Sequence, residues 1–244
     1  MHRSYPRGPI FDMMLTRNKK SKMMRRLYHM LFCPFSRKIA MGVREKELGL
    51  EEILERPLKL SADLLKMNLT GSMPFLIDQA LICNHHYAAC EYLDEMYAHK
   101  ILMGESPLRR AHVRRLMIWF EEDFYQEVFL SVFYEKIGKI HKERLPPDAV
   151  RIKKGLAAIP GYMKILNALA EKDHFLAGRD FSWADITAIA HLSCLDYLGH
   201  IPWRQFPAAH EWSMKIKSRP SFRPFLSETL PNIQPAPHYP LLDF

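Results

Sequence analysis

Leu27-Tyr-His-Met-Leu-Phe-Cys-Pro-Phe-Ser-Arg-Lys38 is the stretch at which a strand pattern gives way to a helix pattern. Apolar residues run up to the pair Cys33-Pro34 and stop there. Proline has a fixed φ and no N–H, so it ends a strand readily and fits the first turn of a helix. The later apolar residues are three to four positions apart, which predicts a helix over 34–47. Cys33 therefore precedes a helix N-terminus, where free N–H groups and the helix dipole stabilise a thiolate.

The positive charge of the chain is concentrated at its beginning. The 244 residues carry a net charge of +8, but residues 1–26 contain eight Lys and Arg against one acid, Asp12. That segment accounts for +7 and leaves +1 for the rest of the chain. The body of the protein therefore lacks the broad basic excess that is typical of nucleic-acid-binding proteins. Because no run of about 18 apolar residues is present, we predict no membrane span.

Residues 1–23 resemble neither a secretory signal nor a strand, because they lack a continuous apolar core and a small-residue cleavage site. Three interpretations remain open: a disordered basic arm, a targeting or membrane-surface segment, or an overlong start. We favour a true start at Met23 or Met24, because Met24 runs directly into the first strand. The four cysteines show no Cys-x-x-Cys spacing, which favours reduced thiols in a cytoplasm.

The remaining sequence divides into three parts. Residues 24–100 alternate between strand and helix patterns, with a proline, Pro74, directly before the third of four predicted strands. Residues 106–230 contain only helix patterns, including a long helix from 107 to 136 and a strongly apolar, buried one from 182 to 199. Residues 231–244 contain four prolines, which exclude a helix and favour an extended tail. The tail ends in apolar residues, which predicts either partner recognition or packing against the body of the protein.

The order of these elements, together with specific motifs, resembles the glutathione S-transferase superfamily. Cys33-Pro-Phe-Ser resembles its nucleophile motif, Met73-Pro74 its cis-proline, and Phe175-Leu-Ala-Gly-Arg-Asp-Phe-Ser-Trp-Ala-Asp-Ile its C-terminal folding motif. Ser182 and Asp185 have the spacing of a reciprocal helix cap, so we interpret both as structural. The resemblance implies an α/β plus all-α protein. A thioredoxin-like domain with a mixed four-stranded sheet is followed by an all-helical C-terminal domain.

One departure from the family pattern concerns the ligand pocket, which the resemblance places at Cys33, Met73, Pro74, His85 and His86. Most members have Glu-Ser or Asp-Ser at the helix that receives the γ-glutamyl end of glutathione, whereas this chain has His85-His86. Two imidazoles cannot reproduce an acidic and a hydroxyl partner. We therefore expect no cofactor and assign no catalytic residue. We also expect no metal, because no His-x₃-His or Glu-x-x-His companion accompanies His85-His86. Cys33 is the candidate thiol of an alternative, glutathione-dependent transferase or thiol reductase.

The chain also resembles an alphaproteobacterial subgroup of this fold whose members bind the tubulin-like division protein FtsZ as homodimers. Their C-terminus ends in His-Tyr-x-x-Leu-Asp-Phe, and this chain ends in His-Tyr-Pro-Leu-Leu-Asp-Phe. The resemblance implies a non-enzymatic protein that bends or bundles FtsZ filaments at the division site. It assigns partner binding to six tail residues: Pro237, His238, Tyr239, Leu242, Asp243 and Phe244.

Two further features of the helical half have open interpretations. Arg114 and Arg115 belong to a basic cluster early in the long helix, which faces either an acidic partner such as FtsZ or water. An aromatic series over 119–134 is interpreted as core or dimer interface, or as the wall of an apolar groove.

Overall fold

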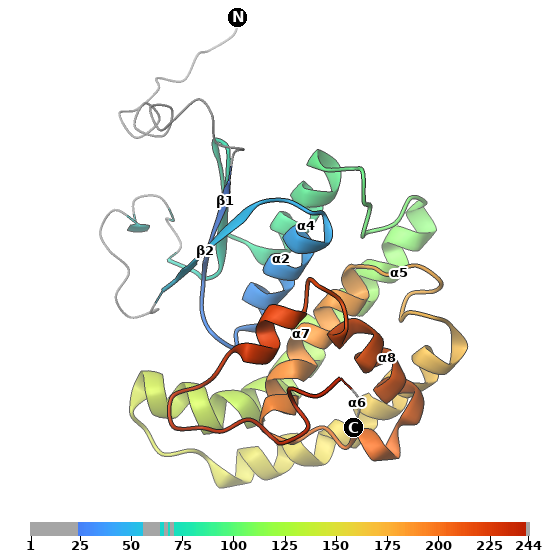
Figure 1. Cartoon of the computed structure of the whole chain (residues 1–244). Helices are drawn as coiled ribbons and strands as arrows, with labels where there is room; N and C mark the ends of the chain where they lie inside the picture. The colour runs from blue at the N-terminus through green and yellow to red at the C-terminus, as the bar shows by residue number, and fades with distance from the viewer. Residues whose placement is uncertain (1–23, 56–63, 66–67, 69–70, 243–244) are drawn as a thin grey trace, which may run out of the picture.

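The computed structural model describes residues 24–55, 64, 65, 68 and 71–242 (Figure 1). The basic segment 1–23 and the last two residues, Asp243 and Phe244, lie outside the described residues. Residues 56–58 of the second predicted strand, which the sequence pattern places over 52–58, lie outside them as well.

The N-terminal half contains a mixed four-stranded sheet, as predicted, and the strands lie in the order β2-β1-β3-β4. The strand β1 (Arg25–His29) pairs in parallel with β2 (Leu50–Leu54) and antiparallel with β3 (Phe75–Asp78). The strand β4 (Leu81–Cys83) completes the sheet antiparallel to β3. The first strand ends earlier than its apolar pattern predicts, because the chain turns at Phe32, whose φ of 52° is left-handed.

Two helices, α2 (Pro34–Glu45) and α4 (His86–Met96), cover the face of the sheet that is turned toward the helical half (Figure 1). The predicted apolar face of α2 is buried at Ile39, Ala40 and Val43, because it is enclosed between the sheet and the helical domain.

The C-terminal half is entirely helical, as predicted. The described elements are α5 (Pro107–Ile118), η2 (Trp119–Glu143), α6 (Ala149–Lys172), α7 (Trp183–Tyr197), η3 (Trp203–Gln205), α8 (Pro207–Lys217) and η4 (Arg223–Ser227). The wider, π-type helix η2 continues α5 without a break, so the long helix extends past its predicted end to Glu143. Pro160 lies inside α6 and does not interrupt it. Over the described parts of the chain, every helix is too short or too polar to cross a membrane.

The helix α7 is the centre of the molecule, and all of its residues are buried. It packs against α2 from the N-terminal half. A Cβ atom on Gly42 of α2 would lie only 1.8 Å from the ring of Trp183, so this close approach requires glycine. The indole N–H of Trp183 also donates to Asp94 of α4 at 3.1 Å. The two halves therefore share one continuous core.

Candidate functional site

Cys33, the candidate thiol, occupies the N-cap of α2 and is only 9% exposed. Its side chain makes no cap hydrogen bond to the helix. Burial raises the pKa of the thiol, and the neighbouring polar groups of Ser36 and Arg37 offset only part of this effect. The sequence predicts that the helix N-terminus stabilises a thiolate here. In the structure the loss of hydration is the larger effect, so Cys33 is a neutral thiol at neutral pH.

Met73 and Pro74 lie at the same end of the sheet as Cys33. Their peptide bond is cis. Tyr28 pairs with Phe75 in the antiparallel register, which places Pro74 beside the carboxyl end of β1, from which the chain leads to Cys33. The side chain of Met73 packs against the Tyr28–Phe75 cluster, which is separate from the main core. The fold thus brings these three members of the predicted pocket to one end of the sheet.

The two histidines of the predicted pocket make contacts within the protein. Nδ1 of His85 accepts the backbone N–H of Tyr87 at 3.3 Å and so caps α4. The ring of His86 stacks on Phe35 with 4.2 Å between centroids and 20° between planes. Nδ1 of His86 lies 3.0 Å from Nζ of Lys38. Burial lowers the pKa of His86, so the ring is neutral at neutral pH and its Nδ1 accepts a hydrogen bond from the Lys38 ammonium.

Lys38 is also paired with a carboxylate that the sequence analysis did not single out, Glu121 of η2. Their side chains are 0% and 6% exposed. Burial by itself raises the pKa of Glu121, but the charge of Lys38 outweighs it and lowers that pKa to about 2. The pair links α2 to η2 at the position where the resemblance places a ligand pocket. The sequence does not indicate this ion pair, because Lys38 and Glu121 are 83 residues apart in the chain.

A second residue that sequence reasoning missed is His191 of α7. Its Nδ1 lies 2.8 Å from the carbonyl oxygen of Thr187, which can only accept, so Nδ1 carries the proton. Its Nε2 is therefore an acceptor, and within the described residues it is buried without a hydrogen-bond partner. Burial lowers the pKa of His191 to about 4. Five rings surround the imidazole at centroid distances of 5.6 to 6.3 Å: Phe35, Phe120, Phe124, Tyr125 and Phe129.

Side chains of the protein itself therefore occupy the space between the two halves near Cys33. Phe35 contacts His86 on one side and Tyr125, at a centroid distance of 5.0 Å, on the other. The described residues form no cluster of three His, Cys, Asp or Glu that could hold a metal ion. This arrangement contains a neutral thiol, neutral histidines and an internally paired carboxylate, and it is suited to joining the domains.

The C-terminal tail folds back over the helical half (Figure 1). Tyr239 is completely buried, and its hydroxyl lies 3.2 Å from Arg37 of α2. His238 is partly buried beside Asp196, with 2.8 Å between Nε2 and Oδ1. Pro237 and Leu242 are exposed. The tail residues with predicted partner roles thus differ in accessibility, and Tyr239 cannot touch a partner while the tail is packed in this way.

The two arginines predicted to face a partner also differ. Arg114 forms a bidentate pair with Glu91 of α4, at 2.8 and 2.9 Å, whereas Arg115 is exposed. A shallow pocket of about 540 Å³ beside Arg115 is lined by residues of the first turns of α5. Ser182 and Asp185 form the reciprocal cap at the start of α7, with 3.0 Å between the Ser182 N–H and the Asp185 carboxylate.

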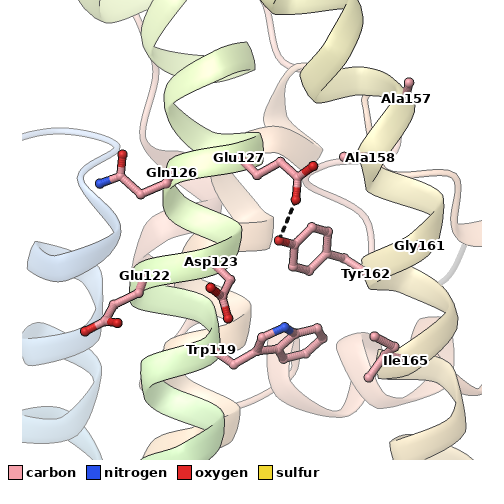
Figure 2. A pocket seen from close by; sticks show the side chains of 10 residues that line it. All are labelled: Trp119, Glu122, Asp123, Gln126, Glu127, Ala157, Ala158, Gly161, Tyr162 and Ile165. Carbon is pink, nitrogen blue, oxygen red and sulfur yellow. Dashed lines mark hydrogen bonds between the residues drawn. The ribbon is translucent and has the colours of Figure 1, made fainter.

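An open groove with a volume of about 770 Å³ lies between η2 and α6, and none of the predicted pocket residues lines it. Figure 2 shows Trp119 of η2 facing Tyr162 and Ile165 of α6. The rings of Trp119 and Tyr162 stack at 5.4 Å, and the Tyr162 hydroxyl donates to Glu127 at 2.9 Å. Further acidic and polar lining comes from Glu122, Asp123 and Gln126, so η2 presents an acidic side to this groove.

Comparisons with known proteins agree with this architecture. The model described as glutathione S-transferase, N-terminal domain, matches residues 27–101, and the corresponding C-terminal domain model matches residues 128–220. The chain is 36% identical over 225 residues to FtsZ-localized protein A of Caulobacter vibrioides, which covers 90% of this chain and 98% of that protein.

Two solved structures are also similar. The crystal structure of a glutathione S-transferase from Rhodospirillum rubrum has a TM-score of 0.87 and 40% identity, and FzlA from C. crescentus has 0.85 and 36%. Each match covers 91% of this chain and 100% of the other.

Proposed function

The chain belongs to the glutathione S-transferase family, and from this premise we propose that it is a non-enzymatic cell-division protein that binds FtsZ filaments. It acts in the cytoplasm at the division site as a homodimer and bends or bundles the filaments during constriction, without a cofactor. One observation carries the proposal: the match to FtsZ-localized protein A extends over 98% of that relative, at 36% identity.

The geometry around Cys33 supports a role without chemistry. A nucleophilic cysteine requires a thiolate that solvent or substrate can reach, and Cys33 is buried with a raised pKa. The γ-glutamyl end of glutathione requires an acidic and a hydroxyl partner, and the corresponding histidines are engaged with Tyr87 and Lys38.

The alternative function is a glutathione-dependent transferase or thiol reductase that uses Cys33. The similarity to the structure of a glutathione S-transferase from Rhodospirillum rubrum favours this alternative. It requires the stack of Phe35 on His86 to open and Cys33 to become accessible.

The groove between η2 and α6 supports the homodimer. In a two-fold interface the same surface is used twice, so each patch must complement another patch of the same surface. The η2 side of the groove is acidic at Glu122 and Asp123, while α6 presents exposed lysines at Lys153, Lys154 and Lys164. Antiparallel apposition of two copies places the acidic side of η2 against the basic side of α6 twice. The small lining residues Ala157 and Gly161 allow close approach.

Co-pelleting with FtsZ polymerised by GTP tests the proposed function. The full-length chain should pellet with the polymer and remain in the supernatant when GDP replaces GTP. Failure to pellet in GTP would refute FtsZ binding. Retention on immobilised glutathione, released by free glutathione, would favour the alternative, and a Cys33→Ser variant measures the contribution of the thiol.

Three charge substitutions extend this test. Asp123→Lys should shift the protein from dimer to monomer in light scattering, and addition of Lys154→Asp should restore part of the dimer. A dimer unaffected by Asp123→Lys would exclude this groove as the interface. Arg115→Glu should weaken FtsZ binding and its salt dependence if the basic cluster faces the filament, whereas equal affinity across salt concentrations would assign Arg115 to solvent.

A further inference from the structure

Arg37, in the first turns of α2, is a buried charge whose contacts come from distant parts of the chain. It is 2% exposed. Its Nη1 donates to the hydroxyls of Ser193, at 2.7 Å, and Tyr239, at 3.2 Å, and its Nη2 donates to Glu228 at 2.7 Å. Its guanidinium also lies 4.2 Å from the centre of the Phe32 ring. A single side chain of the N-terminal half thus connects α7, the segment after η4 and the tail.

The tail residues before Tyr239 are held by a second set of contacts at the end of α7. The N–H of Ala236 donates to the carbonyl of Tyr197 at 2.8 Å, and the hydroxyl of Tyr197 donates to the carbonyl of Ile233 at 2.6 Å. His238 lies 2.8 Å from Asp196, and the Tyr239 hydroxyl also donates to the carbonyl of Phe225 at 3.2 Å. These bonds fix the path of residues 233–239 along the end of α7.

Accessibility changes abruptly after Tyr239. Tyr239 is 0% exposed, whereas Leu241 and Leu242 are 46% and 37% exposed. Two adjacent exposed leucines are held at a fixed position by a buried arginine, which is how an apolar contact is preorganised for a partner.

We propose that Arg37 clamps the tail through Tyr239, so that residues 233–239 form an internal anchor and Leu241 and Leu242 form the apolar tip that contacts the partner. The identity of the partner, the FtsZ filament, rests on the proposed function. Arg37 and Tyr239 are then positioning residues, which affect filament binding without touching the filament.

The test combines amide hydrogen exchange with co-pelleting on the full-length protein. Tyr239→Phe removes only the hydroxyl that Arg37 and Phe225 bond, and it keeps the buried ring. Loss of hydrogen bonds that include a charged donor should speed exchange at the amides of Ala236 and Tyr239 by about tenfold or more. The matched control is Tyr92→Phe, which removes a hydroxyl bonded to Asp78 in the other half and should leave tail exchange unchanged.

The tip variant, Leu241→Ser with Leu242→Ser, separates anchor from contact. We expect it to lose most co-pelleting with FtsZ while the tail amides exchange as in the unchanged protein, and Tyr239→Phe to weaken co-pelleting and speed exchange. Unchanged exchange in Tyr239→Phe would refute the clamp, and unchanged pelleting of the tip variant would refute the contact. If the unchanged protein does not pellet, the proposed function and the FtsZ assignment fail together, and the exchange data still decide the clamp.

Discussion

Acid should destabilise this protein through His191, and the replacement His191→Gln should remove that part of the pH dependence. In the folded chain the imidazole is enclosed by aromatic rings, and only its Nδ1 has a hydrogen-bond partner among the described residues. Protonation would add a charge and an unsatisfied N–H in this apolar surrounding. Burial therefore lowers the pKa of His191 to about 4.

The size of the effect follows from linkage between protonation and folding. An unfolded histidine has a pKa of about 6.5, so between that pH and about 4 the unfolded chain binds the proton and the folded chain does not. Stability therefore falls as the pH falls through this window. With these two values, His191 alone lowers the free energy of unfolding by about 2 kcal/mol between pH 7.5 and pH 5. His86 and His200, whose pKa values are also lowered by burial, act in the same direction.

Urea unfolding at several pH values between 7.5 and 5 measures this contribution of His191 to the free energy of unfolding. The unchanged protein should lose about 2 kcal/mol more over this range than His191→Gln, because glutamine does not titrate. The control His174→Gln replaces an exposed histidine and should leave the pH dependence of the unchanged protein in place. Parallel stability curves for the unchanged protein and His191→Gln would refute the burial argument.

Three replacements, each measured by urea unfolding at neutral pH, test contacts at the interface between the domains and the cap of α7. Glu121→Gln leaves the buried Lys38 ammonium without its charge partner and should cost about 3–5 kcal/mol; if Glu121→Leu with Lys38→Met is no more stable than Glu121→Gln, that explanation fails. Gly42→Ala places a methyl group 1.8 Å from the Trp183 ring and should cost about 1–3 kcal/mol, so a neutral effect would contradict the close approach. Ser182→Ala removes one half of the helix cap and should lower the free energy of unfolding by about 1 kcal/mol. An unchanged free energy of unfolding would show instead that Asp185 alone holds the helix end.

Local sequence patterns predicted the order and type of the elements well. The pair Cys33-Pro34 marks a strand-to-helix junction because proline limits both backbone dihedrals and hydrogen bonding, and these limits act within a few residues. The burial of α7 and the cap at Ser182 follow from composition and spacing in the same way. Element ends were less predictable: the turn at Phe32 shortens the first strand, and the long helix continues past its predicted end to Glu143.

The candidate site could be predicted only in part. Sequence reasoning identified Cys33, Pro74 and His86 because they stand at the positions of recognisable family motifs. It missed Glu121 and His191, whose partners are distant in the chain. The available signal for His191 was its place as a polar residue in a helix predicted to be buried. A buried polar group needs a hydrogen-bond partner or must be in its uncharged form.

The sequence by itself determined the two-part architecture and the division of the tail as a separate segment with an apolar end. Only the tertiary structure decided that Cys33 is a buried neutral thiol, that His86 is engaged by Lys38, and that Tyr239 is an anchor. The physical reason is that pKa values and accessibility depend on burial and on charges brought together by folding. Arg37 and Tyr239 are 202 residues apart in the chain, and they meet only because α2 packs against α7 beneath the returning tail.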